Sequence, residues 1–113
     1  MKIGVIRYPG SNCFYDTMRY FNDKENKCIE IWYKKEKLDE IIDLLIIPGG
    51  FAFGDRYYEN ATEEYTYDPG KMCIDAPVTK IILDTYIKKI PILGICNGFQ
   101  ILIKLGLLPG KLI

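Results

Sequence analysis

Two short apolar runs, each followed within two residues by glycine, are the feature that most limits how this chain can fold. Residues 43–47 (DLLII) are followed by Pro48, Gly49 and Gly50, and residues 90–93 (IPIL) are followed by Gly94. A continuous apolar run of this length is typical of a strand buried on both faces, as in a parallel sheet covered by helices. The two runs therefore favour an α/β fold in which sharp turns follow two of the strands.

The rest of the chain alternates between strand and helix patterns. Two further strands are predicted at residues 2–8 and 28–33, and the second apolar run places the fourth strand at residues 92–95. A helix capped by Ser11 or Asn12 is expected to reach about Asp23, with Met18 and Phe21 among its apolar positions.

A second helix is predicted from about Ala76 to Lys89. Asp75 is placed to cap this helix, and Pro77 lies in its first turn, where proline is tolerated. Its buried face is expected to carry Ile81, Ile82, Thr85 and Tyr86. The preceding residues, 51–74, have the character of a long insertion between the third and fourth strands.

The alternation predicts a single domain, residues 1–113, of the doubly wound α/β class with a mostly parallel sheet. Ligands bind beyond the carboxyl ends of the strands in such sheets. Basic and acidic residues are equal at 15 each, so no overall field favours nucleic acid or an anionic membrane as a partner. The apolar stretches are too short for a membrane span and no signal peptide is recognisable, so a cytoplasmic location is expected.

The stretch GICNGFQ places Cys96 between Gly94 and Gly98, directly after the last predicted strand. A strand that turns sharply into a helix holds its corner residue in a strained conformation, and small neighbours leave the backbone room to pass. The helix N-terminus would then favour a thiolate at the corner. We interpret Cys96 as a nucleophile. The competing interpretation is a buried apolar cysteine whose glycine neighbours serve only close packing.

Histidine is absent from the 113 residues, and this limits the chemistry available. Any mechanism that needs an imidazole base must find it outside these residues. The four cysteines have no C-x-x-C spacing, so neither a zinc site nor a redox dithiol is predicted. Cys13 lies near a strand end but lacks the corner pattern, and a packing role is expected for it.

Three stretches together carry a family resemblance. Residues 2–13 (KIGVIRYPGSNC), 46–55 (IIPGGFAFGD) and 91–102 (PILGICNGFQIL) resemble the glutaminase subunits of phosphoribosylformylglycinamidine synthase, which are class I, triad-type glutamine amidotransferases of purine biosynthesis. The resemblance covers nearly the whole chain. It implies a flavodoxin-like, doubly wound fold with a nucleophile elbow.

The resemblance also implies roles for individual residues. Cys96 would attack the side-chain amide of glutamine, forming a thioester and releasing ammonia. The backbone N–H groups of Gly50 and Asn97 would form the oxyanion hole. Gly49 and Gln100 would belong to the substrate-binding site: Gly49 would give its loop backbone freedom, and Gln100 would help to hold the glutamine. In this family the ammonia passes to a synthetase subunit that uses ATP and magnesium, a small accessory subunit takes part, and the glutaminase part needs no cofactor or metal.

One departure from that family concerns the triad. Its histidine and glutamate lie downstream of the nucleophile, and this chain does not reach them. Loss of the base is expected to cost roughly two to four orders of magnitude in rate, so the chain is interpreted as the first half of a fuller glutaminase. Two alternatives remain: a non-catalytic docking or regulatory fragment of the same complex, and a cysteine hydrolase of the wider flavodoxin-like superfamily. A cysteine hydrolase of that superfamily would be expected to have an acidic residue at the end of the first strand, where this chain has Arg7 and Tyr8, and this mismatch counts against it.

Two segments rich in charged residues are not expected to carry catalytic residues. Residues 34–40 carry both signs and are expected to form a solvated short helix or loop. Residues 56–74 are longer than the loop expected at this place and combine tyrosines with carboxylates. A contact surface for a partner subunit and a solvated surface loop are equally open interpretations of this segment.

Overall fold

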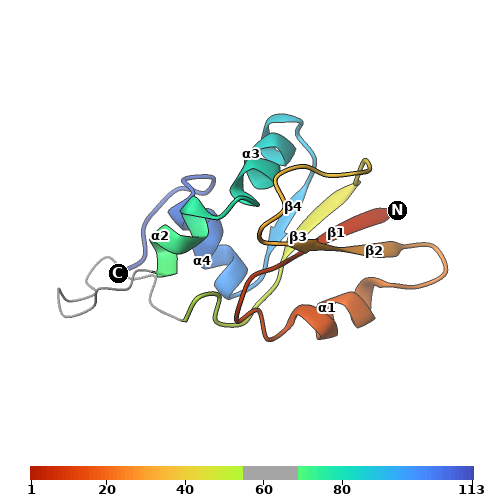
Figure 1. Cartoon of the computed structure of the whole chain (residues 1–113), viewed down its shortest axis with the longest axis horizontal. Coiled ribbons are helices and arrows are strands. Elements are labelled where there is room, and N and C mark those ends of the chain that lie inside the picture. The colour runs from red at the N-terminus through yellow and green to blue at the C-terminus, as the bar shows by residue number, and fades with distance from the viewer. Residues whose placement is uncertain (55–68) are drawn as a thin grey trace.

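The computed structural model describes residues 1–54 and 69–113, which form a layered α/β structure. Four strands of this part pair in parallel in the order β2-β1-β3-β4: β1 (Lys2–Arg7), β2 (Lys27–Trp32), β3 (Leu44–Ile47) and β4 (Ile92–Gly94). Figure 1 shows them with the described helices α1 (Phe14–Phe21), α2 (Pro69–Asp75), α3 (Thr79–Ile87) and α4 (Asn97–Lys104). The predicted doubly wound α/β fold is confirmed.

Helices cover the sheet from both sides, which explains its continuous apolar strands. Side chains alternate between the faces along a strand. Ile3, Val5 and Ile46 pack with Phe14 of α1, where Met18 and Phe21 also lie. Their neighbours in the strands pack on the other face with residues of α2, α3 and α4: Ile6, Leu45, Ile47, Cys73, Ile81, Ile82, Ile101 and Leu102. Each apolar run therefore fills two cores at once.

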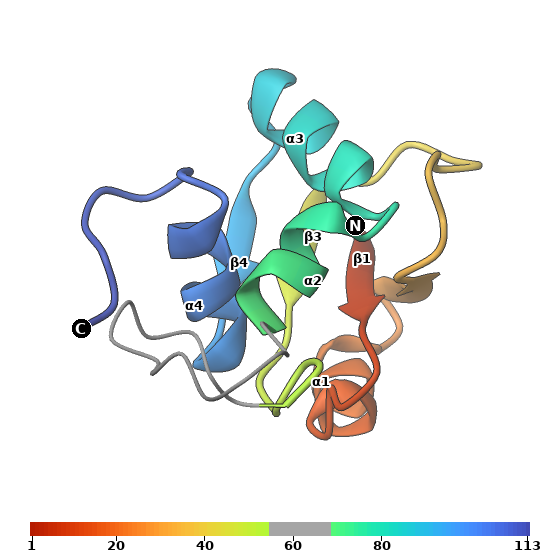
Figure 2. The same ribbon diagram turned by 60° about the vertical axis from the view of Figure 1, so that its left-hand side comes forward.

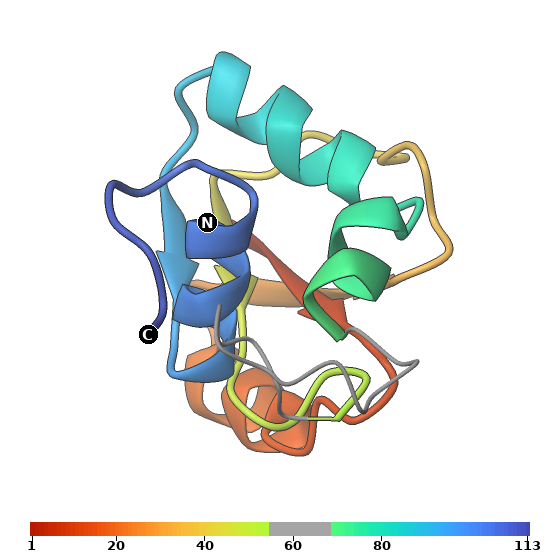
Figure 3. The ribbon, with the colours of Figure 1, turned by 90° about the vertical axis from the view of Figure 1, so that its left-hand side faces the viewer.

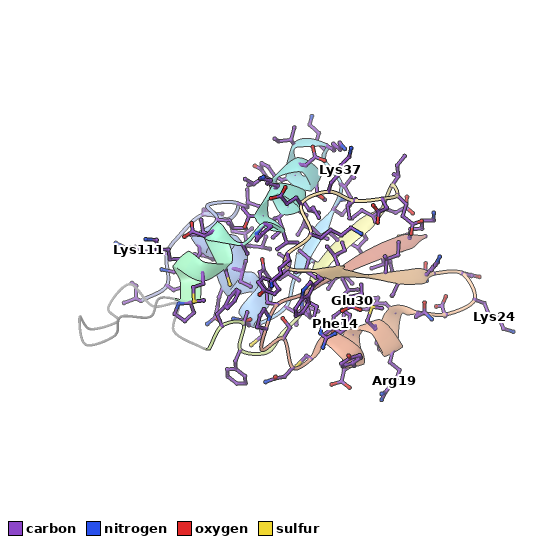
Figure 4. The ribbon with its side chains drawn as sticks, viewed as in Figure 1. Phe14, Arg19, Lys24, Glu30, Lys37 and Lys111 are labelled. Atoms are coloured by element: carbon purple, nitrogen blue, oxygen red, sulfur yellow. The ribbon has the colours of Figure 1, made fainter. Side chains whose placement is uncertain are left out.

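Helix α1 begins later than the sequence predicts. Figure 4 shows Phe14 pointing from α1 toward the sheet, while Arg19 points away from it. The residue at the N-cap position is Cys13, and no side chain caps the helix. The Ser11 hydroxyl instead accepts a hydrogen bond from the Tyr8 backbone N–H at 3.0 Å. The predicted cap at Ser11 or Asn12 is wrong because Ser11 stabilises the preceding turn.

The segment before α3 differs most from the prediction. Residues 69–75 form α2 rather than the end of an insertion, and Asp75 is the last residue of α2 instead of the cap of α3. Val78 occupies the N-cap position of α3, without a side-chain cap. Pro77 lies in the turn between the two helices, where the Thr79 N–H donates to the Ala76 carbonyl at 3.0 Å. Proline at this place separates two helices that the apolar spacing alone does not distinguish.

The buried face of α3 is correctly predicted except at its end. Ile81, Ile82 and Thr85 are buried, whereas Tyr86 is 54% exposed. The last turn of α3 projects beyond the rest of the described fold (Figure 3), and Tyr86 lies in this turn. Residues 34–40 form a loop with turns and no helix. In the described parts of the chain, no helix has the length and apolar character needed to cross a membrane.

Candidate active site

The turns that follow β1, β3 and β4 gather at one edge of the sheet (Figure 3). They meet because the carboxyl ends of parallel strands share an edge. Backbone hydrogen bonds join the first two turns: the Phe51 N–H donates to the Gly10 carbonyl at 2.8 Å, and the Cys13 N–H donates to the Gly49 carbonyl at 3.2 Å. Figure 2 shows the turn after β3 close to the start of α1. These contacts form a framework beside the start of α4.

Cys96 stands at the corner between β4 and α4, in the strained conformation that the sequence predicts. Its φ is 53° and its ψ is −108°, values that side-chain-bearing residues rarely adopt. A Cβ on Gly98 would lie 1.9 Å from the Ile47 carbonyl oxygen, and one on Gly94 would lie 2.6 Å from Leu102. Both glycines are therefore required for β4, α4 and β3 to pack at this corner, and the corner has the shape of a nucleophile elbow.

The Cys96 residue is exposed, which excludes the interpretation as a buried packing cysteine. Gly49 lies beside it: a Cβ added to Gly49 would sit 3.6 Å from the Cys96 Cβ. The unusual backbone conformation belongs to Gly50, whose φ is 134°, and not to Gly49. The prediction that Gly49 supplies backbone freedom is thus wrong, because its φ does not require glycine. A Cβ at Gly49 would make only ordinary van der Waals contacts with its neighbours.

The two backbone N–H groups predicted for the oxyanion hole are those of Gly50 and Asn97. Within residues 1–54 and 69–113, neither N–H donates a hydrogen bond. Gly50 is held in place by close packing, since a Cβ there would lie 2.4 Å from the Asn12 backbone nitrogen. Asn97 is the first residue of α4, so its N–H belongs to the unpaired group at the helix start. Their role as oxyanion donors remains a prediction.

The side chain of Asn97 connects two parts of the site. It is 1% exposed, and its Oδ1 accepts a hydrogen bond from the Ala52 N–H at 3.0 Å. Its Nδ2 donates to Gln100 Oε1 at 3.1 Å. Gln100, predicted to help hold the substrate, is half-buried and lies one helical turn from Cys96, with its N–H donating to the Cys96 carbonyl at 3.1 Å.

Cys13 is a site residue that sequence reasoning missed. The residue is exposed, and its Sγ lies 3.7 Å from the point where Gly49 would carry a Cβ, so both Cys13 and Cys96 adjoin Gly49. The packing role expected for Cys13 stays a prediction. Cys13 reaches the site because its own N–H donates to the Gly49 carbonyl. Only its position after the first strand signals this in the sequence.

Arg7 and Tyr8, at the end of β1, have structural environments. The Arg7 guanidinium donates to Glu30 at 3.0 Å, and this hydrogen bond raises the pKa of Arg7. Tyr8 is buried beneath the turn after β3, with its ring edge-on to Phe53 at 5.9 Å between centroids. Burial raises the pKa of Tyr8, so its hydroxyl stays protonated. Neither Arg7 nor Tyr8 is itself the acidic residue that the wider cysteine hydrolases would want at this place.

The tyrosines and carboxylates predicted as a partner surface or a solvated loop fall mostly on residues 56–68, which lie outside the described residues. The remainder, residues 69–74, belongs to α2. Among the described residues, no three histidine, cysteine or acidic side chains are grouped so that they could hold a metal ion.

Comparison with known proteins gives a consistent result along the chain. Residues 1–112 match the family model described as a CobB/CobQ-like glutamine amidotransferase domain. The chain is 42% identical over 113 residues to phosphoribosylformylglycinamidine synthase subunit PurQ of Aquifex aeolicus, covering 100% of this chain and 45% of that relative. It is 40% identical over 113 residues to the PurQ subunit of Leptospira interrogans, with 100% and 47% covered.

A solved structure supports the same likeness. The structure of PurLQS from Thermotoga maritima matches with a TM-score of 0.74 at 33% identity, over 97% of this chain and 46% of that chain. The present chain thus spans about half the length of the curated relatives it matches. The three turns of the site all lie within the aligned part of this chain.

Proposed function

The chain belongs to the CobB/CobQ-like glutamine amidotransferase family, and from this premise we propose that it is the nucleophile-bearing part of a glutaminase of the PurQ type. The observation that carries the proposal is the strained, exposed Cys96 beside two backbone N–H groups that make no hydrogen bond within the described residues. A nucleophile next to unengaged donors is the arrangement that acyl transfer requires.

The proposed reaction proceeds through a covalent intermediate. The Cys96 thiolate attacks the side-chain amide carbon of glutamine, and a carbon–sulfur bond forms while the carbonyl oxygen gains negative charge. The N–H groups of Gly50 and Asn97 stabilise this oxyanion. The carbon–nitrogen bond then breaks, and the nitrogen leaves as ammonia after taking a proton. Water later attacks the γ-glutamyl thioester and releases glutamate, which restores the thiol.

Proton transfer is the step that these 113 residues do not supply. The leaving nitrogen needs a proton, and the attacking water must lose one. No histidine occurs in the sequence, so we propose that the imidazole base comes from outside these residues. With that base, the site would complete the glutaminase reaction. Without it, Cys96 is expected to acylate only with substrates whose leaving group needs no proton.

The partners follow from the relatives. Those relatives are subunits of phosphoribosylformylglycinamidine synthase, and the similar solved structure is that of PurLQS. We propose that the ammonia is consumed by a synthetase subunit of the PurL type, which uses ATP and magnesium, and that a small accessory subunit of the PurS type joins the assembly. In this scheme the present chain holds the glutamine and carries no cofactor.

The test is acylation by the γ-(4-nitrophenyl) ester of L-glutamate. Its leaving group departs as a stable anion, so attack by Cys96 needs no histidine. We expect a stoichiometric burst of nitrophenolate, followed by slow turnover, and a mass increase of one γ-glutamyl group. Peptide mapping should place that group on Cys96, and L-glutamine should compete with the ester.

Two variants complete the test. Cys96→Ser should abolish the fast burst, whereas Cys28→Ser should retain it, because Cys28 lies in β2 away from the three turns. A wild-type burst no larger than that of Cys96→Ser would contradict the proposed function. Acylation mapped to Cys13 would identify a different nucleophile.

A docking or regulatory fragment remains the second candidate, because the sequence contains no histidine. Such a fragment would bind the synthetase subunit without chemistry at Cys96. Binding retained in Cys96→Ala, together with no acylation of the wild-type chain, would favour this candidate.

A further inference from the structure

We propose that Asn97 is a positioning residue. Its side chain ties the turn after β3 to the start of α4, and so sets the separation of the two proposed oxyanion donors, the N–H groups of Gly50 and Asn97. The catalytic part of this inference rests on the proposed function. The contact itself does not, because it can be tested without any reaction.

The contact joins parts of the chain that are distant in sequence. Asn97 Oδ1 accepts from the Ala52 N–H across 45 positions, in a buried hydrogen bond of 3.0 Å. Ala52 lies two residues after Gly50, and Asn97 carries the second donor on its own backbone. One buried bond therefore links the turn that presents the Gly50 N–H group to the start of α4, which presents that of Asn97. Removing one partner of a buried hydrogen bond is in general destabilising.

The orientation of the Asn97 amide is determined by its neighbours. A backbone N–H can only donate, so the Asn97 oxygen must face Ala52 and its NH₂ group must face Gln100. The NH₂ group donates to Gln100 Oε1 at 3.1 Å. Bonds at both ends restrict the rotation of the side chain, so the link is rigid and does not depend on helix packing alone.

Two further supports of this turn come from the direction of β1. The Phe51 N–H donates to the Gly10 carbonyl at 2.8 Å, and Gly50 packs closely against the backbone of Asn12. These contacts hold the turn against the segment after β1. They do not reach α4, whereas the Asn97 side chain does. Without Asn97, the Gly50 donor could move relative to Cys96 while the β1 side of the site stayed in place.

The separation of the donors matters because an oxyanion hole works by preorganisation. The donors must stand near 2.7–3.1 Å from the place where the oxyanion will form, and one lost donor typically costs 10²–10³-fold in rate. A displaced donor should cost less than a lost one. We therefore expect weakening of the bond to slow acylation of Cys96 by about 10- to 100-fold.

Three variants separate positioning from general destabilisation. Asn97→Leu keeps the size of the side chain but removes both hydrogen bonds. Asn97→Asp keeps an acceptor for the Ala52 N–H and loses the donor to Gln100. The control is Thr85→Val, which removes a different buried side-chain hydrogen bond, from the Thr85 hydroxyl to the Ile81 carbonyl at 2.7 Å, in α3.

The first measurement is the rate of amide hydrogen exchange at Ala52 in the 113-residue chain. NMR monitors this rate, and the exchange rate of the Val5 amide in β1 serves as the internal reference. Asn97→Leu should accelerate Ala52 exchange by about tenfold. Asn97→Asp should stay close to wild type, as should Thr85→Val. Unchanged Ala52 exchange in Asn97→Leu would overturn the link, whatever the activity of the chain.

The second measurement compares two reactions of Cys96. Acylation by the glutamate nitrophenyl ester develops an oxyanion, whereas alkylation by iodoacetamide does not. Asn97→Leu should slow the first and leave the second nearly unchanged, and Asn97→Asp should recover part of the loss. Parallel loss of both reactions would reduce Asn97 to a purely structural residue and overturn the positioning role.

The outcomes also distinguish this inference from the proposed function. If the wild-type chain acylates at Cys96 and Asn97→Leu acylates equally fast, the positioning role fails and the proposed function stands. If the wild-type chain shows no Cys96-dependent acylation, the proposed function fails, and Ala52 exchange alone decides whether Asn97 ties the two loops together.

Discussion

Two buried polar side chains near the site differ in how they are satisfied. Asn97 has a hydrogen-bond partner at each end of its amide. The Tyr8 hydroxyl, which is buried under the turn after β3, has no partner among the described residues. A buried amide with two partners stabilises a particular arrangement, whereas a buried hydroxyl without one is a cost to folding. The two residues should therefore respond in opposite ways to removal of their polar atoms.

Tyr8→Phe is expected to raise the free energy of unfolding by about 1 kcal/mol, because it removes an unsatisfied buried hydroxyl without opening a cavity. Urea unfolding followed by circular dichroism measures the change. Tyr20→Phe is the matched control, since Tyr20 is 80% exposed and its hydroxyl is solvated. A loss of stability in Tyr8→Phe would mean that the hydroxyl has a partner beyond the described residues.

The same residue predicts a pH dependence. Burial raises the pKa of Tyr8 above its ordinary value of 10.0, so in the folded chain it remains protonated where the unfolded chain ionises. The unfolded state then binds fewer protons, and stability falls as the pH rises. Below pH 10 this effect is absent. The difference in unfolding free energy between wild type and Tyr8→Phe should thus grow in favour of the variant as the pH is raised above about 10.

At the scale of elements, the corner between β4 and α4 depends on glycine for different reasons at different positions. Gly98 is required because the β3 backbone occupies the place of a Cβ. Gly106, just after α4, has a φ of 75° and no atom within 4 Å of a Cβ, so only its backbone conformation favours glycine. The two positions therefore separate steric exclusion from backbone strain.

Gly98→Ala is expected to destabilise the chain by about 3 kcal/mol or more, because its Cβ would collide with the Ile47 carbonyl and neither backbone can yield easily. Gly106→Ala should cost only about 1 kcal/mol. Denaturant unfolding of both variants gives the comparison. Equal costs would show that packing of α4 against β3 is looser than the structure indicates.

The elements also differ in how well the sequence predicts them. The strands are found within one or two residues because their apolar runs are local and fill two cores. Helix α2 is missed because its residues, PGKMCID, begin with proline and glycine and are too few to display a helical period. In the fold, α2 packs against α3 and α4 and contributes Cys73 to the core, and its contacts with α4 join segments distant in sequence.

At the scale of the whole molecule, the two faces of the sheet are covered unequally. Helix α1 packs on β1 and β2, whereas β4 forms the far edge of the described sheet. Leu93 of β4 pairs in register with Ile46, whose side chain faces the α1 side. Leu93 is nevertheless 40% exposed, and Ile95 beside it is 39% exposed. Apolar side chains at a strand edge favour association between chains.

The 113-residue chain is therefore expected to self-associate as its concentration rises, and Leu93→Lys should suppress this association with little change in unfolding free energy. Sedimentation equilibrium measures the effect. Ile41→Lys adds the same charge at a residue that is 83% exposed in a loop and should leave the association unchanged. Equal suppression by both variants would indicate a simple effect of charge.

The sequence by itself determined the local features of this protein. The apolar runs predict strands buried on both faces, and the glycines around Cys96 predict a strained corner, because residue period and backbone sterics are properties of neighbouring residues. The same local sequence motifs also show the family resemblance, which the comparisons confirm.

Only the tertiary structure decided the contacts between segments that are distant in sequence. It brought Cys13 beside Gly49, joined the Asn97 side chain to Ala52, and left Tyr86 largely exposed. No local pattern encodes these facts, because each depends on which loops the parallel sheet brings to the same edge and on where its helices end. The chemistry of Cys96 can thus be predicted from its neighbours in sequence, whereas the surroundings that would make it effective arise only when the strands assemble.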